Sequence, residues 1–368
     1  MDSLVQSYKN FEMASIPQPD LPATMRVLQM SGYGGYDVLQ YVEAKAPRLL
    51  YPTDIIIRVH AAGVNPVEDK ARQGNMALLM RLTFPYVLGR DFCGTIVSKG
   101  DEVKNFNIGD EVFGTLPDPS GENGSGTYAE YARVPATKAG IAVKPANVSA
   151  IDAGAAGIAV FTAWRGIVHH GKVKTLSSPK VVVIGASGGV GSYGVQIAKA
   201  FGAYVIAICS GKNAELAKKL GADQVLDYTI ENSIREFSLQ EKDAVDIIFD
   251  AVGGEDYWNL LSATLKPSGV YSSAVGPIEH SGSQRVGFMD IAKTLSSIAG
   301  HKMFGSRKYQ FIYSLPYEDM PEITTLFEEG KIKSYVPEDQ VFPLKDGAKA
   351  HELIASHRAK GKVVLVMN

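Results

Sequence analysis

The feature that most constrains the fold is a run of valines that passes directly into glycines and then into a helical pattern. Residues 180–184 read KVVVI, residues 185–191 read GASGGVG, and a helix-like segment follows to residue 201. A strand, a glycine turn and a helix in this order are typical of dinucleotide binding, because glycines let the backbone approach a pyrophosphate at a helix N-terminus. We therefore predict that this segment binds a dinucleotide.

Two frames of this turn fit the fingerprint G-x-G-x-x-G. The frame of Gly189, Gly191 and Gly194 matches it literally but begins well after the strand should end. The frame of Ala186, Gly188 and Gly191 has alanine first and begins where the strand stops. We prefer the second frame on that geometry.

The second strand of the unit indicates which dinucleotide is bound. Residues 204–209 lead into Ser210 and Lys212, with no acidic residue before Glu215. NAD enzymes place Asp or Glu here to hold the ribose 2′-hydroxyl, whereas a hydroxyl and an ammonium suit a 2′-phosphate. This pattern favours NADPH. In the alternative, Ser210 caps the next helix and Lys212 is a solvated surface charge.

The surrounding pattern predicts two domains of different architecture. From residue 180, strand-like and helix-like segments alternate, which is typical of a parallel sheet with helical crossovers. Strands are expected at 180–185, 204–209, 224–228, 245–250 and 269–275, and helices at 189–201, 213–220 and 255–265. Before residue 150, short β-like runs between glycine turns predict a compact antiparallel barrel or sandwich. Pattern alone leaves open which domain takes the last helix-like segment and strand, 346–357 and 362–366.

Length and charge narrow the class of protein. The 368 residues are roughly two to three typical domains long, with a net charge of −2 and no long basic run. This argues against nucleic acid or an anionic membrane as a partner. Residues 1–24 carry three acids against one lysine, unlike an Arg-rich mitochondrial transit peptide, and no apolar run suggests a membrane span. We expect a cytoplasmic protein, with mitochondria as the less favoured location.

Seven further motifs occur in a fixed order along the chain. They are AAGVNPVEDK at 61–70, LGRDFCG at 88–94, GDEVFG at 109–114, GTYAEY at 126–131, FTAW at 161–164, LGAD at 220–223 and DAVGG at 250–254. With the glycine turn, this set resembles the zinc-independent quinone oxidoreductase (zeta-crystallin and enoyl reductase-like) branch of the medium-chain dehydrogenase/reductase superfamily, and is similar to its fungal members. The resemblance covers about residue 25 to the end.

The resemblance implies an α/β fold that combines a GroES-like β-barrel domain with a Rossmann domain, a doubly wound parallel sheet. The implied segments are an N-terminal tail (1–24), the first part of the catalytic GroES-like domain (25–150), a Rossmann NADP-binding domain (151–300) and a C-terminal segment returning to the catalytic domain (301–368). Relatives commonly dimerise through the edge of the Rossmann sheet, so the resemblance suggests a homodimer formed near 269–276.

The resemblance and the cysteine count together predict a site without zinc. Zinc dehydrogenases of this superfamily have Cys where this chain has Asn65, and a His-Glu pair where it has Arg90 and Asp91. The chain has only two cysteines, Cys93 and Cys209, too few for the paired cysteines of a structural zinc site.

Carried over residue by residue, the resemblance implies a cofactor site and three catalytic candidates. The cofactor residues are Asn65, Thr162, Ala186, Ser187, Gly188, Gly189, Val190, Gly191, Ser210, Lys212, Tyr228, Val252, Gly253 and Lys360. Lys212 lies one place before the usual family lysine, where this chain has Asn213. The catalytic candidates are Asn65, Lys70 and Tyr128, with Lys70 preferred as proton donor. A surface role for Lys70 and a packing role for Tyr128 stay open.

The expected reaction transfers hydride from NADPH to a quinone or to the double bond of an α,β-unsaturated carbonyl, with a proton from a side chain or water. Two alternatives stay open: a carbonyl reductase for aldehydes or ketones, and a non-catalytic dinucleotide-binding protein with a structural or regulatory role. The substrate should be a small hydrophobic carbonyl or quinone. Its pocket is expected in loops 72–86 and 276–312, with Met76, Met80, Phe288, Met303 and Phe304.

Overall fold

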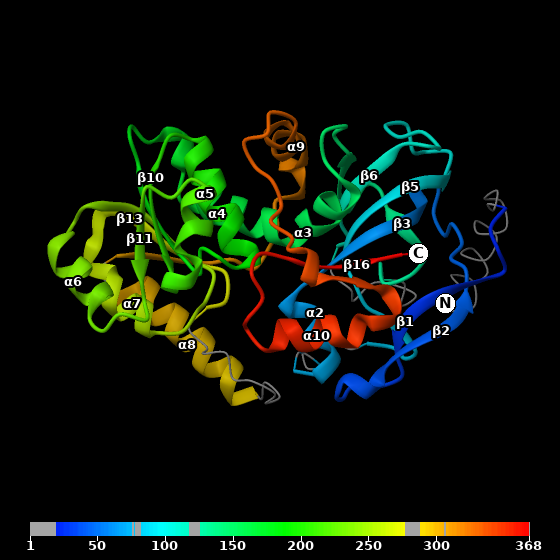
Figure 1. Cartoon of the computed structure of the whole chain (residues 1–368), viewed down its shortest axis with the longest axis horizontal. Helices are drawn as coiled ribbons and strands as arrows, with labels where there is room; N and C mark the ends of the chain where they lie inside the picture. The colour runs from blue at the N-terminus through cyan, green and yellow to red at the C-terminus, as the bar shows by residue number, and fades with distance from the viewer. Residues whose placement is uncertain are drawn as a thin grey trace.

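The computed structural model describes residues 20–75, 77, 82–117, 126–276, 288–304 and 307–367. Figure 1 shows two sheet domains side by side, one built from both ends of the chain and the other from its middle. Helix α3 (Ala150–Trp164) lies between them. The expected combination of an antiparallel β domain and a doubly wound parallel sheet is confirmed.

The first domain is built on a seven-stranded sheet in the order β15-β16-β3-β5-β6-β8, with β7 paired to β3. A three-stranded sheet, β2-β1-β4, completes it, and helices α2 (Pro66–Gln73) and α10 (Gly347–Ala355) contact each other there. The strands are β1 (Thr24–Met30), β2 (Leu39–Lys45), β3 (Asp54–Val64), β4 (Tyr86–Val87), β5 (Asp91–Lys99), β6 (Glu111–Thr115), β7 (Tyr131–Pro135), β8 (Gly140–Val143), β15 (Val341–Pro343) and β16 (Val363–Val366).

The second domain is a six-stranded parallel sheet in the order β11-β10-β9-β12-β13-β14. The strand order reverses between β9 and β12, and ligands of such sheets bind at the carboxyl ends of the strands at this switch point. The strands are β9 (Lys180–Ile184), β10 (Tyr204–Cys209), β11 (Gln224–Asp227), β12 (Val245–Asp250), β13 (Leu265–Ser273) and β14 (Lys308–Phe311). The helices are α4 (Gly189–Ala200), α5 (Ala214–Lys219), α6 (Ser233–Gln240), α7 (Asp256–Leu261) and α8 (Phe288–Phe304). Helix α9 (Met320–Glu328) instead contacts β8 of the first domain.

The far edge of this sheet differs from the prediction. β14 pairs in parallel with β13, so the sheet continues beyond residue 300, where the sequence placed the end of this domain. The expected dimerisation edge near 269–276 is therefore wrong as an edge, because β13 has β12 on one side and β14 on the other. β14 reads KYQF, and its two polar residues interrupt the continuous apolar run by which the other strands of this sheet were predicted.

The last strand returns to the first domain, as the resemblance implied. β16 pairs antiparallel with β3, with Val363 opposite Val64. Just before it, the Gly361 N–H donates to the Ser187 carbonyl oxygen at 2.8 Å, and Gly361 forms an isolated bridge with Gly188. The C-terminal segment therefore connects the glycine turn directly to the barrel.

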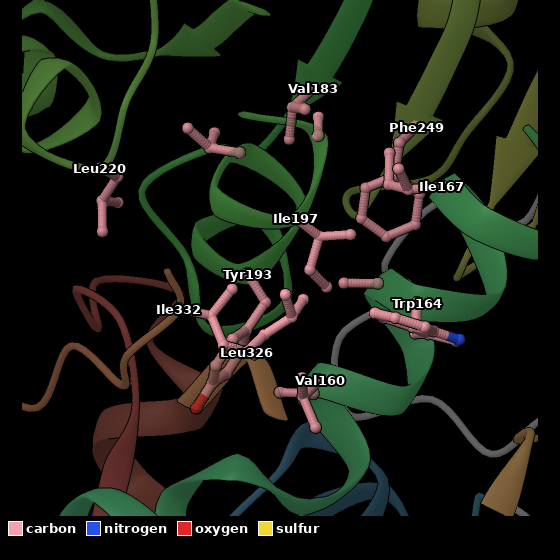
Figure 2. Close-up of a cluster of buried hydrophobic side chains, with 14 of the residues drawn as sticks. Val160, Trp164, Ile167, Val183, Tyr193, Ile197, Leu220, Phe249, Leu326 and Ile332 are labelled. Atoms are coloured by element: carbon pink, nitrogen blue, oxygen red, sulfur yellow. The ribbon is translucent and has the colours of Figure 1, made fainter. Parts of the chain in front are cut away.

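One hydrophobic core spans both domains around α3. Figure 2 shows Val160 and Trp164 on this helix near Ile197 of α4 and Phe249 of β12, and the core continues to Phe113 in the barrel. The segment from Ala150 to Thr175 is long and apolar enough to cross a membrane, but 72% of its apolar window is buried within the protein. Its hydrophobic character is that of a helix packed between two sheets.

Candidate active site

The glycine turn after β9 has the geometry that a pyrophosphate requires. β9 ends immediately before Gly185, whose φ is +76°, and α4 begins at Gly189. A Cβ on Gly191 would lie 2.1 Å from the Gly185 carbonyl oxygen, so this helix and strand approach closely only with glycine. A Cβ on Gly188 would meet only that oxygen, at 3.3 Å. With the N–H groups of the first turn of α4, residues 186–191 fit a dinucleotide pyrophosphate.

The two frames of the turn can now be compared. Gly194, the last glycine of the literal frame, lies inside α4, where a Cβ would be 2.8 Å from the Phe249 ring. Its role is packing against the sheet. The frame that begins at Ala186 is the one that matches the turn itself.

The turn after β12 is fixed by a buried aspartate. Oδ1 of Asp250 accepts the N–H groups of Val252 and Gly253, both at 2.9 Å, and Oδ2 accepts two buried hydroxyl groups. Burial raises the pKa of Asp250, and these hydrogen bonds oppose that shift. A Cβ on Gly185 would lie 2.9 Å from Cγ2 of Val252, so the turns after β9 and β12 meet at the switch point of the sheet.

The side chains predicted around the adenosine phosphate gather at the ends of β10 and β11. Ser210 is buried, whereas Lys212 and Tyr228 are exposed. Asn213, which stands where relatives have lysine, donates from Nδ2 to Oγ of Ser187 at 3.0 Å. Asn213 therefore supports the glycine turn.

An acidic residue that was not predicted for the site, Asp227, lies at the same edge. Asp227 ends β11, and a Cβ on Gly211 would lie 2.2 Å from its Oδ2. Hydrogen bonds from Thr229 lower the pKa of Asp227, which favours the charged form. The prediction searched only the residues that follow β10, whereas the parallel pairing of β10 and β11 places Asp227 beside them.

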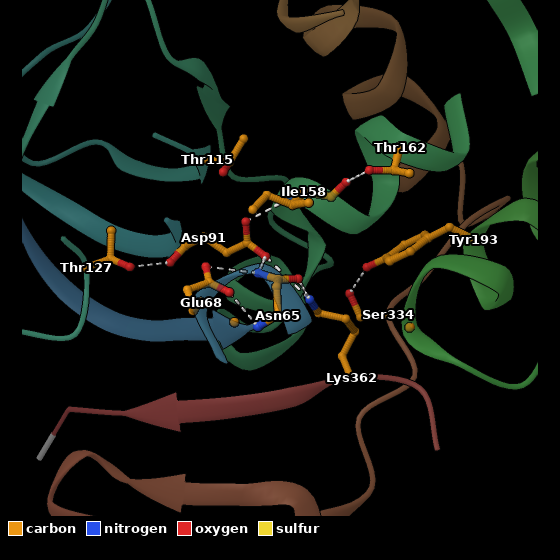
Figure 3. Close-up of polar contacts among 12 residues, drawn as sticks. Asn65, Glu68, Asp91, Thr115, Thr127, Ile158, Thr162, Tyr193, Ser334 and Lys362 are labelled. Atoms are coloured by element: carbon orange, nitrogen blue, oxygen red, sulfur yellow. Dashed lines mark hydrogen bonds and ion pairs between the residues drawn. The ribbon is translucent and has the colours of Figure 1, made fainter. Parts of the chain in front are cut away.

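Asn65 lies in a buried polar cluster on the barrel side (Figure 3). Its Nδ2 donates to Oδ2 of Asp91 at 2.9 Å, and its Oδ1 accepts from the Lys362 ammonium at 2.5 Å. The backbone N–H of Asn65 donates to Glu68 at 2.8 Å. These four residues, which we call the Asn65 cluster, are each at most 3% exposed.

Asp91 joins the Asn65 cluster to α3. Its Oδ1 accepts the N–H of Ile158 at 2.8 Å, while its Oδ2 also lies 3.4 Å from the Lys362 ammonium. At Gly157 the helix leaves helical geometry, and a Cβ there would lie 1.9 Å from Oδ1 of Asp91. Glycine at this position lets the carboxylate reach the helix backbone.

Glu68 balances the charge of the cluster. Burial, and then the charge of Asp91, raise the pKa of Glu68 to about 7, although Lys362 opposes the shift. Near neutral pH the Glu68 carboxyl group is therefore partly protonated, so it adds less than a full negative charge beside Asp91 and Lys362. Such a cluster avoids a second uncompensated buried charge.

Lys70, the preferred proton donor, is not part of the hydrogen bonds of this cluster. It is half-buried on α2, and burial lowers its pKa while Asp69 opposes the shift. Two residues beyond Glu68, it points about 200° away around the helix. A role in proton transfer stays a prediction for Lys70.

Tyr128 and Thr162 use their hydroxyl groups within the fold. Tyr128 is fully buried, with its hydroxyl 3.5 Å from the Gly63 carbonyl oxygen, a position that matches the packing role left open above. Thr162 donates to the Ile158 carbonyl oxygen at 2.7 Å within α3.

Of the two lysines near the C-terminus, the structure brings Lys362 to the glycine turn, whereas Lys360 is exposed. A Cβ on Gly189 would lie 2.8 Å from Cδ of Lys362, so the stem of this lysine crosses the first turn of α4. The sequence held a signal for it, since Lys362 directly precedes the apolar strand VVLV.

The residues of the Asn65 cluster do not fit zinc. The amide of Asn65 is a poor zinc ligand, and the Lys362 ammonium bonded to it would repel a divalent cation. Arg90 instead donates to the Leu116 carbonyl oxygen at 3.0 Å and to the Tyr317 hydroxyl at 2.9 Å. Within the described residues, no group of three or more His, Cys, Asp or Glu side chains is arranged to hold a metal ion.

Several residues predicted to line the substrate pocket lie in parts of the chain that the structure does not describe. Met76 and Met80 lie outside the described residues, as do the side chains of Phe288, Met303 and Phe304.

A dinucleotide-type sheet joined to a barrel that carries a polar site defines a two-domain dehydrogenase or reductase fold. Two family models match the chain: the alcohol dehydrogenase GroES-like domain over residues 51–145, and zinc-binding dehydrogenase over residues 220–365. The chain is 32% identical to the mitochondrial NAD(P)H oxidoreductase RTN4IP1 of Mus musculus, over 90% of this chain and 87% of that protein.

Two further relatives come from other kingdoms. Trans-enoyl reductase pgmF of Aspergillus terreus is 30% identical over 94% of this chain and 97% of that protein. The Escherichia coli quinone oxidoreductase, solved in complex with NADPH, is 26% identical with a TM-score of 0.72, over 94% of this chain and all of that chain. This chain belongs to the quinone oxidoreductase branch of the medium-chain dehydrogenase/reductase superfamily and is an oxidoreductase. The mitochondrial relatives weigh against the expected cytoplasmic location.

Proposed function

We propose that this chain is an NADPH-dependent, zinc-independent reductase of quinones or of the double bond of α,β-unsaturated carbonyls. The observation that carries the proposal is the contact between the glycine turn and the Asn65 cluster, made by Lys362. It puts a dinucleotide cradle and a buried ammonium at one site. The names of the fungal and bacterial relatives, an enoyl reductase and a quinone oxidoreductase, point to these two substrate classes.

In the proposed mechanism the bound nicotinamide supplies hydride. Residues 186–191 hold the pyrophosphate, Val252 and Gly253 support the nicotinamide half, and Asn65 lines the adjacent space. Catalysis then depends on holding an electron-poor acceptor in line and on delivering a proton to its oxygen.

NADPH preference follows from Ser210 and Lys212, which offer a hydroxyl and an ammonium to a 2′-phosphate, with Tyr228 beside them. Asp227 opposes the same phosphate, so we expect a moderate preference over NADH. Replacing Lys212 by alanine should lower the NADPH to NADH ratio of kcat/KM about tenfold, the value of one charge-assisted hydrogen bond. The exposed Lys218, which pairs with Glu215, gives the matched control K218A.

The test of function is to follow NADPH absorbance with a quinone, an enal and a simple aldehyde in parallel. Turnover of the quinone or the enal is expected. Turnover of the aldehyde alone would show that the protein is a carbonyl reductase and would overturn the proposal. Tight NADPH binding without turnover of any of the three substrates would favour a non-catalytic role. Stoichiometric zinc in elemental analysis would overturn the metal-free mechanism.

A further inference from the structure

We propose that Lys362 is the catalytic acid of this site, and that its ammonium binds the substrate oxygen and protonates it as hydride arrives. The inference rests on the proposed reductase function and assigns its proton to one residue. Lys362 lies against the glycine turn and is bonded to Asn65, whereas neither Lys70 nor Tyr128, the candidates predicted from sequence, makes these two contacts within the described residues.

Lys362 is fixed by contacts with both domains. Its backbone N–H donates to the Tyr335 carbonyl oxygen at 2.9 Å, and its carbonyl oxygen accepts from Nε2 of Gln340 at 2.9 Å. Its stem crosses the first turn of α4 at Gly189, and its side chain is 4% exposed. A proton donor held this firmly loses little entropy when the substrate binds.

The ammonium has one N–H left for a ligand. Lysine has three such donors, and two of them point to Oδ1 of Asn65 and Oδ2 of Asp91. The third has no acceptor within the described part of the chain. The Nδ2 group of Asn65 donates to Asp91 at 2.9 Å and to Glu68 at 3.4 Å, which keeps Oδ1 turned toward the ammonium (Figure 3). Since Asn65 is predicted to line the space beside the nicotinamide, the third N–H is placed for a substrate oxygen.

For an enone, the step balances as follows. Hydride forms a C–H bond at the β-carbon, the π electrons move to the carbonyl oxygen, and that oxygen takes a proton from the Lys362 ammonium. The enol converts to the saturated carbonyl in water, and the neutral amine regains a proton from water. Charge that develops on the oxygen meets a donor already in place, the arrangement that lowers barriers most.

The experiment compares K362M with K349M, in which an exposed lysine of α10 that pairs with Asp346 loses the same charge. Both kcat at saturating NADPH and NADPH affinity, from fluorescence titration, are measured. We expect kcat of K362M to fall about 10²- to 10³-fold with NADPH affinity retained, and K349M to match the wild type. Weakened NADPH binding with kcat retained at saturation would identify a phosphate-binding lysine and overturn the proposal.

Two further arms protect the test against misfolding. K362M leaves the buried Asp91 carboxylate without its counter-charge, so the measurements are repeated on the double variant K362M/D91N. The amide oxygen of D91N still accepts the N–H of Ile158, and thermal melts verify that each variant folds. In K362A, added methylammonium should restore part of kcat, and a well-folded K362A that no small amine rescues would count against an acid. Absence of wild-type turnover would overturn the proposed function as well, whereas full activity of K362M would overturn this inference alone.

Discussion

The two glycines Gly188 and Gly191 should separate the stability of the turn from its binding function. In G191A the new methyl group would lie 2.1 Å from the Gly185 carbonyl oxygen, and β9 and α4 would have to part by more than about 1 Å to reach ordinary van der Waals contact. Backbone atoms cannot rotate away, so we expect the upper end of an overpacking cost, about 3 kcal/mol of unfolding free energy. That is a large part of the stability of a typical domain.

G188A should behave in the opposite way. Its methyl group would meet only the same oxygen, at 3.3 Å, and its φ of −86° suits alanine, so the free energy of unfolding should change by less than about 1 kcal/mol. The methyl group would stand where the pyrophosphate approaches, and NADPH affinity should fall at least about tenfold.

The assay is chemical unfolding with and without NADPH, together with NADPH titration. Wild-type protein at 100 times Kd should gain about 2.7 kcal/mol from the ligand, and G188A at the same NADPH concentration should lose about half of that gain or more. Gly300, inside α8 with open space around its Cβ position, gives the control G300A, which should stabilise by about 0.5–1 kcal/mol. A G191A protein as stable as wild type, or a G188A protein that binds NADPH normally, would refute the reasoning.

Two other predictions concern buried carboxyl groups. Because the pKa of Glu68 is raised to about 7 from 4.5, the folded chain holds a proton that the unfolded chain releases between those values, and stability should fall as pH rises through them, by at most about 3 kcal/mol. E68Q should reduce the dependence of the free energy of unfolding on pH, measured by urea unfolding at several pH values. An unchanged pH dependence would show that a group other than Glu68 causes it. D250A should cost about 3 kcal/mol, because it strands the N–H groups of Val252 and Gly253, whereas D250N keeps an acceptor and should cost less than half of that in thermal melts.

The parallel sheet could be predicted from sequence because its signals are local. β9 and β10 are almost entirely apolar runs of the length of a strand, β12 carries the apolar run Ile247–Phe249, and β9 leads straight into the glycine turn. Strand β14 was missed because its sequence, KYQF, lacks a continuous apolar run. Asp227 was missed because pairing across a parallel sheet joins residues that are distant in sequence. The position of the glycine turn between β9 and α4 could therefore be predicted from sequence, whereas the residues that surround it in space could not.

The Asn65 cluster marks where prediction from pattern ends. Asn65 and Asp91 were noted one at a time as replacements for zinc ligands, but Lys362 lies 297 residues after Asn65, and no periodicity connects them. The neighbouring Lys360, predicted to bind a cofactor phosphate, is equally basic, and only the pairing of β16 with β3 decides that Lys362 is the lysine that turns inward.

This dependence on tertiary structure links the chemistry of the site to the contact between domains. Lys362 reaches Asn65 only because β16 joins the barrel sheet while Gly361 is bonded to Ser187 in the glycine turn. Asp91, the counter-charge, is tied to α3, whose other side packs on α4. A shift between the two domains would therefore move the ammonium relative to both its acceptors and the cofactor cradle. Since burying an ammonium is favourable only while its partners are in place, the charge of Lys362 itself favours the domain arrangement in which a proton donor stands beside the dinucleotide site.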